Sequence, residues 1–109
     1  NAYVFSDNYY KNSTYDLYFE KTNEEVIVKV YFISNDSSKP NRELNDSVDS
    51  FGWISDNYFI YSKKGKGLYS LDMTTGKISS LILDTMQFNI TETGDAYIIY
   101  DGIEQRFEF

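Results

Sequence analysis

The sequence predicts an all-β protein built of antiparallel hairpins, and three observations lead to this fold class. Residues that suit a pleated surface are abundant, with 11 Tyr and 8 Phe among 109 residues. Apolar and polar residues alternate over short runs, whereas helical spacing of apolar residues is missing. Turn-forming residues separate these runs, and the chain contains a single proline.

The first half of the chain predicts a strand pair with one buried face. Residues 15–21 alternate apolar Tyr15, Leu17 and Phe19 with more polar positions. Residues 25–34 (EVIVKVYFIS) form the longest apolar segment, whereas the polar interval 35–45 is expected to be a loop. The full set of expected strands is 2–5, 15–21, 25–34, 50–54, 58–61, 67–72, 78–83, 86–90, 96–100 and 103–109.

The stretch 58–83 predicts three strands joined by two short turns. Residues 63–67 (KKGKG) are too polar and too rich in glycine for a core, so they are expected to form a hairpin connection. Residues 74–77 (TTGK) carry a tight-turn signal, with Gly76 free to take a positive φ. Asp101-Gly102 is a strong signal for a two-residue hairpin.

An internal repeat links the centre of the chain to its last third. Residues 51–61 and 88–100 each contain a short aromatic-led strand, a turn with Ser or Thr and an acid, and then Tyr-x-Ile-Tyr. Units of several strands that recur at about 40 residues are typical of propeller blades. The sequence therefore predicts a single all-β domain, 1–109, with repeat units 1–45, 46–85 and 86–109.

Residues 53–83 resemble blades of bacterial TolB-like and WD-repeat-like β-propellers. The residues that carry the resemblance are Asp56 to Ser62, Gly67 to Asp72, Thr75 to Lys77, and Leu81. Because they are turn and alternation residues, the resemblance implies a fold element and no reaction. Closed propellers have four or more blades, so the chain is part of a larger propeller, a unit that assembles with copies of itself, or a partial propeller or small two-sheet β domain. The last is the expected architecture, and self-association through sheet edges is an open alternative.

Charge and composition argue against several classes of function. A net charge of −7 without a basic block argues against nucleic acid and against anionic lipid as partners. The chain has no Cys and no His, and hence neither the usual metal ligands nor the usual general base. We find no phosphate-binding loop and no nucleophile–base motif, so we expect no enzyme activity, no catalytic residue and no cofactor. No apolar run reaches the length of a membrane span, about 18 residues.

Acidic residues next to turns are plentiful, and two of them raise the question of a calcium site. Asp46 and Asp49 lie in a short oxygen-rich segment. The segment lacks the spacing and the central glycine of an EF-hand loop. Since aspartates beside turns usually bond to the local backbone, we interpret the segment as a solvated loop without a metal.

The surplus of aromatic residues supplies the candidate ligand face. Tyr and Trp offer a flat apolar surface with a polar group, which suits stacking against sugars. The candidates are Tyr9, Tyr10, Trp53, Tyr58 and Tyr61. Successive residues of a strand point to opposite faces, so at most half of the strand positions share one surface.

These features lead to an expected function in binding. We expect a non-enzymatic binding or scaffolding domain of a bacterial envelope or secreted protein, with a protein or glycan as ligand. The alternative is a carbohydrate-binding module or the non-catalytic part of a glycoside hydrolase. A hydrolase with paired turn carboxylates is a third hypothesis.

Overall fold

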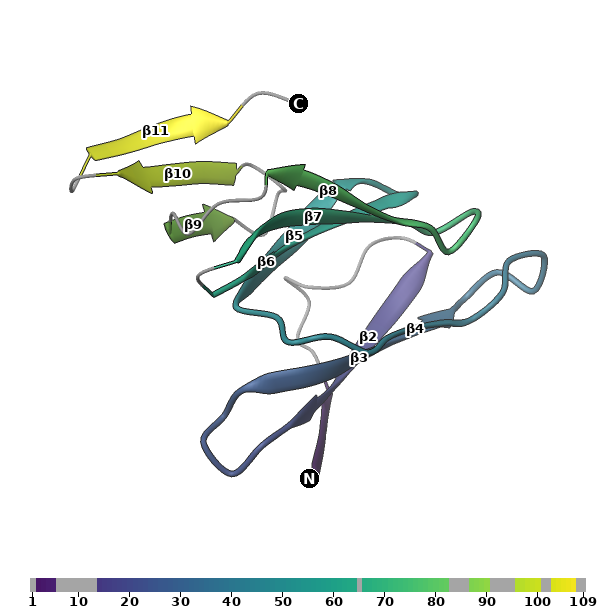
Figure 1. Cartoon of the computed structure of the whole chain (residues 1–109). Coiled ribbons are helices and arrows are strands. Elements are labelled where there is room, and N and C mark those ends of the chain that lie inside the picture. The colour runs from purple at the N-terminus through teal and green to yellow at the C-terminus, as the bar shows by residue number, and fades with distance from the viewer. Residues whose placement is uncertain are drawn as a thin grey trace. The chain divides into compact units, whose positions relative to one another are not determined.

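Antiparallel strands make up the fold (Figure 1). The computed structural model describes residues 2–5, 14–64, 66–82, 87–90, 96–100 and 103–107. Within these ranges it contains eleven strands in three sheets and no helix. The predicted all-β class with meander topology is therefore confirmed.

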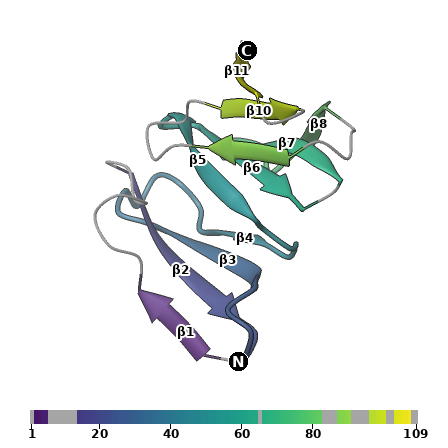
Figure 2. The same cartoon turned by 90° about the vertical axis from the view of Figure 1, so that its left-hand side faces the viewer.

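The first sheet has the strand order β1-β2-β3-β4, so strands that follow one another in sequence are neighbours (Figure 2). Its strands are β1 (Ala2–Phe5), β2 (Tyr15–Lys21), β3 (Ile27–Ser34) and β4 (Arg42–Leu44). The alternation predicted for β2 is confirmed, because Tyr15, Leu17 and Phe19 are buried and the residues between them are half-buried. Val30 and Phe32 of β3 are buried with them.

Strand β4 corrects the expectation that residues 35–45 form a loop. Arg42–Leu44 pairs with β3, where Leu44 lies opposite Val30. Leu44 is only 1 % exposed. A turn at Asp36 and Lys39 brings the chain back beside β3. The strand was missed because it contributes a single apolar side chain within a polar segment.

The start of β3 is a second correction. The sequence predicted a strand from residue 25, but Glu25 has φ 65°, which is left-handed backbone, and β3 begins at Ile27. The Thr22 side chain accepts hydrogen bonds from the backbone N–H groups of Glu24 (3.3 Å) and Val26 (3.2 Å). These bonds hold residues 22–26 in a turn, which leaves Val26 exposed although it is apolar.

The second sheet has the order β5-β6-β7-β8. Its strands are β5 (Ser50–Ser55), β6 (Tyr58–Lys63), β7 (Gly67–Asp72) and β8 (Ile78–Ile82). Phe59 and Tyr61 are buried on one face, and Ile60 and Leu68 are buried on the other. Burial on both faces agrees with the unbroken apolar run of residues 58–61 in β6.

Two of the turns of this sheet, first that between β6 and β7 and second that between β7 and β8, are those that the sequence predicted for residues 63–67 and 74–77. At the second turn the N–H of Gly76 donates to the carbonyl oxygen of Asp72 at 2.7 Å, and Gly76 has φ 79°. The Asp72 carboxylate accepts a hydrogen bond from the N–H of Thr74 at 2.8 Å. At the first turn Gly67 has φ 137°, and the N–H of Lys66 donates to the carbonyl of Lys63.

The third sheet has the order β11-β10-β9. Its strands are β9 (Gln87–Ile90), β10 (Ala96–Tyr100) and β11 (Ile103–Phe107). Strand β9 lies against β5, β6 and β7. Tyr100 pairs with Ile103, as a two-residue hairpin requires, although residues 101 and 102 themselves lie outside the described ranges.

The sheets follow the predicted repeat units along the chain. Strands β1–β4 fall within residues 1–45, β5–β8 within 46–85, and β9–β11 within 86–109. By contacts the chain divides into two compact units, Asn1–Val48 and Asp49–Phe109. That these parts act as one domain stays a prediction.

Candidate ligand-binding surface

The aromatic residues proposed from sequence do not form one surface. Trp53 is 7 % exposed and Tyr61 is fully buried, whereas Tyr58 is 45 % exposed. Tyr9 and Tyr10 lie outside the described ranges. Among the described candidates only Tyr58 is available to a ligand, so a shared platform that includes Trp53 and Tyr61 is wrong.

Trp53 and Tyr61 belong instead to a group of packed rings inside the second unit. Tyr61 stacks between Phe59 and Tyr69, with centroids 6.1 and 5.5 Å away. Phe59 also contacts Trp53 edge-on at 5.2 Å and stacks with Phe51 at 5.8 Å. These rings come from β5, β6 and β7 and share one face of the sheet. Their distances are those of favourable aromatic pairs, which stabilise the core.

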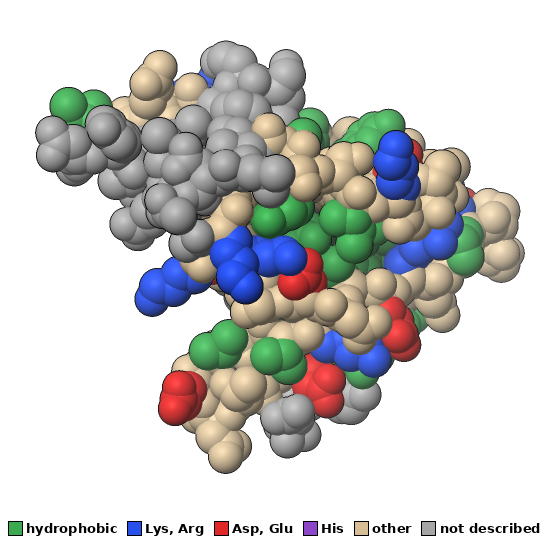
Figure 3. Space-filling model, viewed as in Figure 1, with side chains coloured by type: hydrophobic (Ala, Val, Ile, Leu, Met, Phe, Trp, Pro, Cys, Tyr) green, Lys and Arg blue, Asp and Glu red, His purple; other side chains and the backbone are tan. Residues whose placement is uncertain are grey.

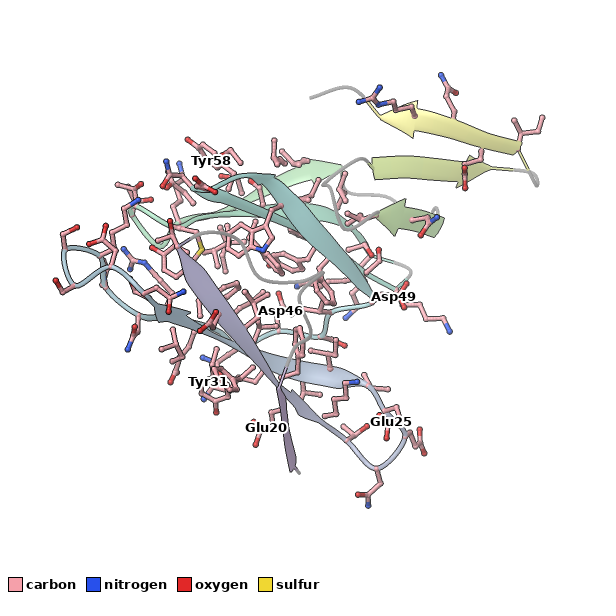
Figure 4. All side chains as sticks on the ribbon, turned by 180° about the vertical axis from the view of Figure 1, so that it is seen from behind. Glu20, Glu25, Tyr31, Asp46, Asp49 and Tyr58 are labelled. Atoms are coloured by element: carbon pink, nitrogen blue, oxygen red, sulfur yellow. The ribbon has the colours of Figure 1, made fainter. Side chains whose placement is uncertain are left out.

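A different group of aromatic and charged side chains lies on the first sheet. The face opposite the buried Leu17 and Phe32 carries residues that are all half-buried or exposed. We call it the open face, and it comprises Asp16, Tyr18, Glu20, Lys29, Tyr31, Ile33 and Glu43. Figure 4 shows Tyr31 and Glu20 on the same side of this sheet.

Strand pairing places the aromatic positions of the open face in one row. Tyr18 of β2 lies directly opposite Tyr31 of β3. On the far side of β2, Phe5 of β1 occupies the register position opposite Tyr18. On the far side of β3, Glu43 of β4 lies opposite Tyr31. The row therefore runs across four adjacent strands and ends in a carboxylate.

Lys29 connects the charges of the open face to its aromatic row. Its Nζ lies 3.4 Å from Oε2 of Glu43 and 4.9 Å from the centre of the Tyr31 ring. Hydrogen bonding to the Tyr31 side chain is the main cause that raises the pKa of Lys29, and the Glu43 carboxylate raises it further against partial desolvation. Because the pKa rises from 10.5, Lys29 carries its charge at neutral pH. An ammonium group thus stays beside the ring.

Asp46 and Asp36 are acidic residues outside the open face whose carboxylates serve local structure. Asp46 accepts a hydrogen bond from the N–H of Ser47 at 3.0 Å, and Asp36 accepts from both the N–H and the hydroxyl of Ser38. Among the described residues no group of three or more acidic, His or Cys side chains could hold a metal ion. Asp46 and Asp49, both labelled in Figure 4, belong to no such group among the described residues.

The hairpin between β6 and β7 carries three described lysines, as expected for a connection that is too polar for the core. Lys64 and Lys66 are exposed, and the Lys63 ammonium lies 4.7 Å over the Tyr69 ring.

On the side of the molecule that Figure 3 draws, basic and acidic side chains are interspersed among polar ones. No helix in the described ranges is long and apolar enough to cross a bilayer.

The open face was missed because sequence alternation does not show strand register. Alternation predicts that Tyr18 and Leu17 point to opposite faces of β2. The residue of β3 that pairs with Tyr18, however, depends on the turn at residues 22–26. A register irregularity at Glu20 and Lys21 shifts the pairing within the same hairpin. Only with this register known do Tyr18 and Tyr31 come together.

Fold and surface together define an antiparallel all-β protein with a mixed aromatic and charged sheet face. Comparison with family models, curated proteins and solved structures finds no significant match for the chain.

Proposed function

We propose that the chain is a non-enzymatic binding domain that holds its ligand on the open face of the first sheet. The observation that carries this proposal is the aromatic row, in which Tyr18 and Tyr31 stay half-exposed. Of the second-sheet rings, by contrast, Trp53, Phe59 and Tyr61 are buried. Aromatic side chains that keep a polar group at the surface are typical of binding surfaces. The setting that we propose is a secreted or cell-envelope bacterial protein.

The topology supports the proposed likeness to propeller blades. A blade is a four-stranded antiparallel sheet, and both β1–β4 and β5–β8 have four strands in sequence order. In this proposal the sheets serve as a scaffold, and the open face of the first sheet binds the ligand. The resemblance carries no reaction with it.

A carbohydrate is the second candidate ligand class, and the spacing of the row favours it. Neighbouring strands lie about 4.8 Å apart, so successive positions of the row are separated by a distance comparable with one pyranose unit. Tyrosine rings present apolar surface to the C–H face of a sugar. Glu20, Glu43 and Lys29 beside the row can accept from or donate to sugar hydroxyl groups.

The binding proposal is tested with two probe sets. One is a panel of neutral oligosaccharides (cellohexaose, laminarihexaose and chitohexaose), and the other is a displayed peptide library selected on the whole chain. We expect one set to give binding that is weakened at least tenfold by Tyr31→Ala. Tyr58→Ala is the matched control, because it removes an exposed tyrosine from a different sheet.

The outcomes separate the alternatives. Oligosaccharide binding that depends on Tyr31 supports the carbohydrate candidate, and peptide binding with the same dependence supports a protein ligand. Binding that depends on Tyr58 and not on Tyr31 contradicts the assignment to the open face.

The absence of enzyme activity is tested separately. Aryl glycosides incubated with the chain are expected to release no aryl alcohol above the uncatalysed rate. Release that disappears when Glu20 or Glu43 is replaced by Gln would contradict the proposal and favour a hydrolase.

A further inference from the structure

The open face carries negative charge that its own residues do not neutralise. Lys29 is its one cation, and although Glu20 is its register partner, its ammonium lies at 3.4 Å from Glu43. Asp16 and Glu20 remain, and neither has an ion-pair partner among the described residues. Both are half-buried. A ligand that covers these carboxylates removes their remaining water, which is unfavourable unless the ligand supplies opposite charge or hydrogen-bond donors.

The chain itself shows which kind of group binds beside a ring of this face. The Lys29 ammonium lies 4.9 Å from the centre of the Tyr31 ring and next to the Glu43 carboxylate. The ring and the carboxylate both attract this cation. Tyr18, directly opposite Tyr31, has a carboxylate two residues away in each direction along β2. The combination of ring and carboxylate is therefore repeated on β2, with Asp16 and Glu20 as the acids.

The spacing along β2 matches that of an extended peptide. Asp16, Tyr18 and Glu20 are alternate residues of this strand, so their Cα atoms follow one another at about 6.8 Å. Alternate side chains of an extended polypeptide point to one side and repeat at the same distance. A peptide that lies along β2 can therefore place three alternate residues over these three positions.

We propose that the open face binds a basic segment of a partner protein, extended along β2, in which three alternate residues are Arg or Lys. The outer two cations pair with Asp16 and Glu20, and the middle cation lies over the Tyr18 ring. This inference rests on the proposed function and narrows its ligand to one class. The net charge of −7 favours such a partner, because it attracts a basic protein and repels an acidic one.

The test is an NMR titration of the whole chain with blocked pentapeptides up to about 10 mM, a concentration that detects weak binding. Salt is kept at about 20 mM, because exposed charges are screened at higher ionic strength. Arg-Ser-Arg-Ser-Arg has alternate cations, and Arg-Arg-Arg-Ser-Ser has the same composition and charge in consecutive positions. We expect the alternate peptide to bind about threefold more tightly, the scale of one exposed ion pair. Glu-Ser-Glu-Ser-Glu should not bind.

Four variants locate the peptide on the chain. Glu20→Gln and Asp16→Asn keep the side-chain shape and remove one counter-charge, so each should weaken the alternate peptide about threefold. Tyr18→Leu should weaken it by a similar factor, whereas Tyr18→Phe keeps the ring and should bind like the parent.

Glu24→Gln is the matched control for the charge variants. It changes the net charge by the same amount at an exposed residue in the turn at 22–26, outside the open face. It should therefore weaken the alternate peptide much less than Glu20→Gln does.

Four results would overturn the proposal. They are no binding of the alternate peptide, equal affinity for the two arginine arrangements, equal weakening by Glu20→Gln and Glu24→Gln, and tighter binding of a glucosamine hexasaccharide, which is a cationic sugar chain. The proposed function fails differently, since it requires only binding that depends on Tyr31. A neutral oligosaccharide or neutral peptide that binds with this dependence would support the open face and contradict a basic partner.

Discussion

At the scale of residues, the main finding is that the aromatic side chains divide into two groups. Tyr61 and Trp53 lie in the core of the second unit, whereas Tyr18 and Tyr31 remain half-exposed. The same residue type therefore has different roles according to strand register and burial. Side chains in turns also have a structural role. Those of Thr22, Asp36 and Asp72 each accept a hydrogen bond from a backbone N–H group.

Asp36 should titrate at a lower pH than an ordinary aspartate. The hydrogen bond from the Ser38 side chain, and then that from the Ser38 N–H, lower the pKa of this carboxyl below 3.8. A lowered pKa stabilises the fold above 3.8, and this contribution is lost as the pH falls through the folded value. NMR titration of the carboxyl should show the lowered pKa, and Ser38→Ala should raise it. Ser37→Ala should leave it unchanged, and an unshifted pKa in the parent chain would contradict the turn geometry.

Glu25 should be replaceable by glycine with a gain in stability. Left-handed backbone costs a non-glycine residue about 1–2 kcal/mol, and Glu25 has φ 65°. The lost ion pair with Lys21 is exposed and contributes little. Urea denaturation of Glu25→Gly should therefore show about 0.5–1 kcal/mol more stability, after allowance for the flexibility of glycine. Glu24→Gly, in the same turn without positive φ, should not stabilise the chain.

At the scale of elements, a part-buried polar pair connects β5 and β6. The hydroxyl oxygens of Ser50 and Ser62 lie 2.6 Å apart, and the N–H of Ser50 donates to Ser62 Oγ at 3.1 Å. Ser62 is only 1 % exposed. Its hydroxyl group therefore satisfies polar atoms of β5 where water has little access.

Ser62→Ala should destabilise the chain because it leaves those atoms without a partner. The expected loss is about 1–3 kcal/mol in the free energy of unfolding. Chemical denaturation measures it, with the exposed Ser47→Ala as control. A loss no larger than that of the control would show that the pair does not stabilise the sheet.

Most strands could be predicted because their patterns are local. β2, β3, β6 and β7 have clear alternation or apolar runs, and the turn with Gly76 has a specific residue requirement. β4 could not be predicted, since it depends on pairing with β3 and adds only Leu44 to the core. For the same reason the burial of two candidate residues, Trp53 and Tyr61, could not be predicted: it depends on packing, which periodicity does not describe.

At the scale of the whole molecule, the sheets follow one another along the chain, and contacts divide it into two units. The sequence predicts that the chain is nevertheless one domain. Trp53 is the only tryptophan and reports on residues 49–109, whereas circular dichroism reports on all strands.

A single domain should unfold in one cooperative transition. Tryptophan fluorescence and circular dichroism should then give the same midpoint in urea. Two separate midpoints would mean that the units unfold independently, and the single-domain prediction would be wrong.

The most direct test of the division between core and surface aromatics compares Tyr61→Ala with Tyr31→Ala by chemical denaturation. Tyr61→Ala should cost about 3–5 kcal/mol in the free energy of unfolding, as expected for a large buried ring. Tyr31→Ala should cost about 1 kcal/mol, the scale of a cross-strand pair on a half-exposed face. Equal losses, or a larger loss for Tyr31→Ala, would place Tyr31 in the core and contradict its assignment to a ligand-binding surface.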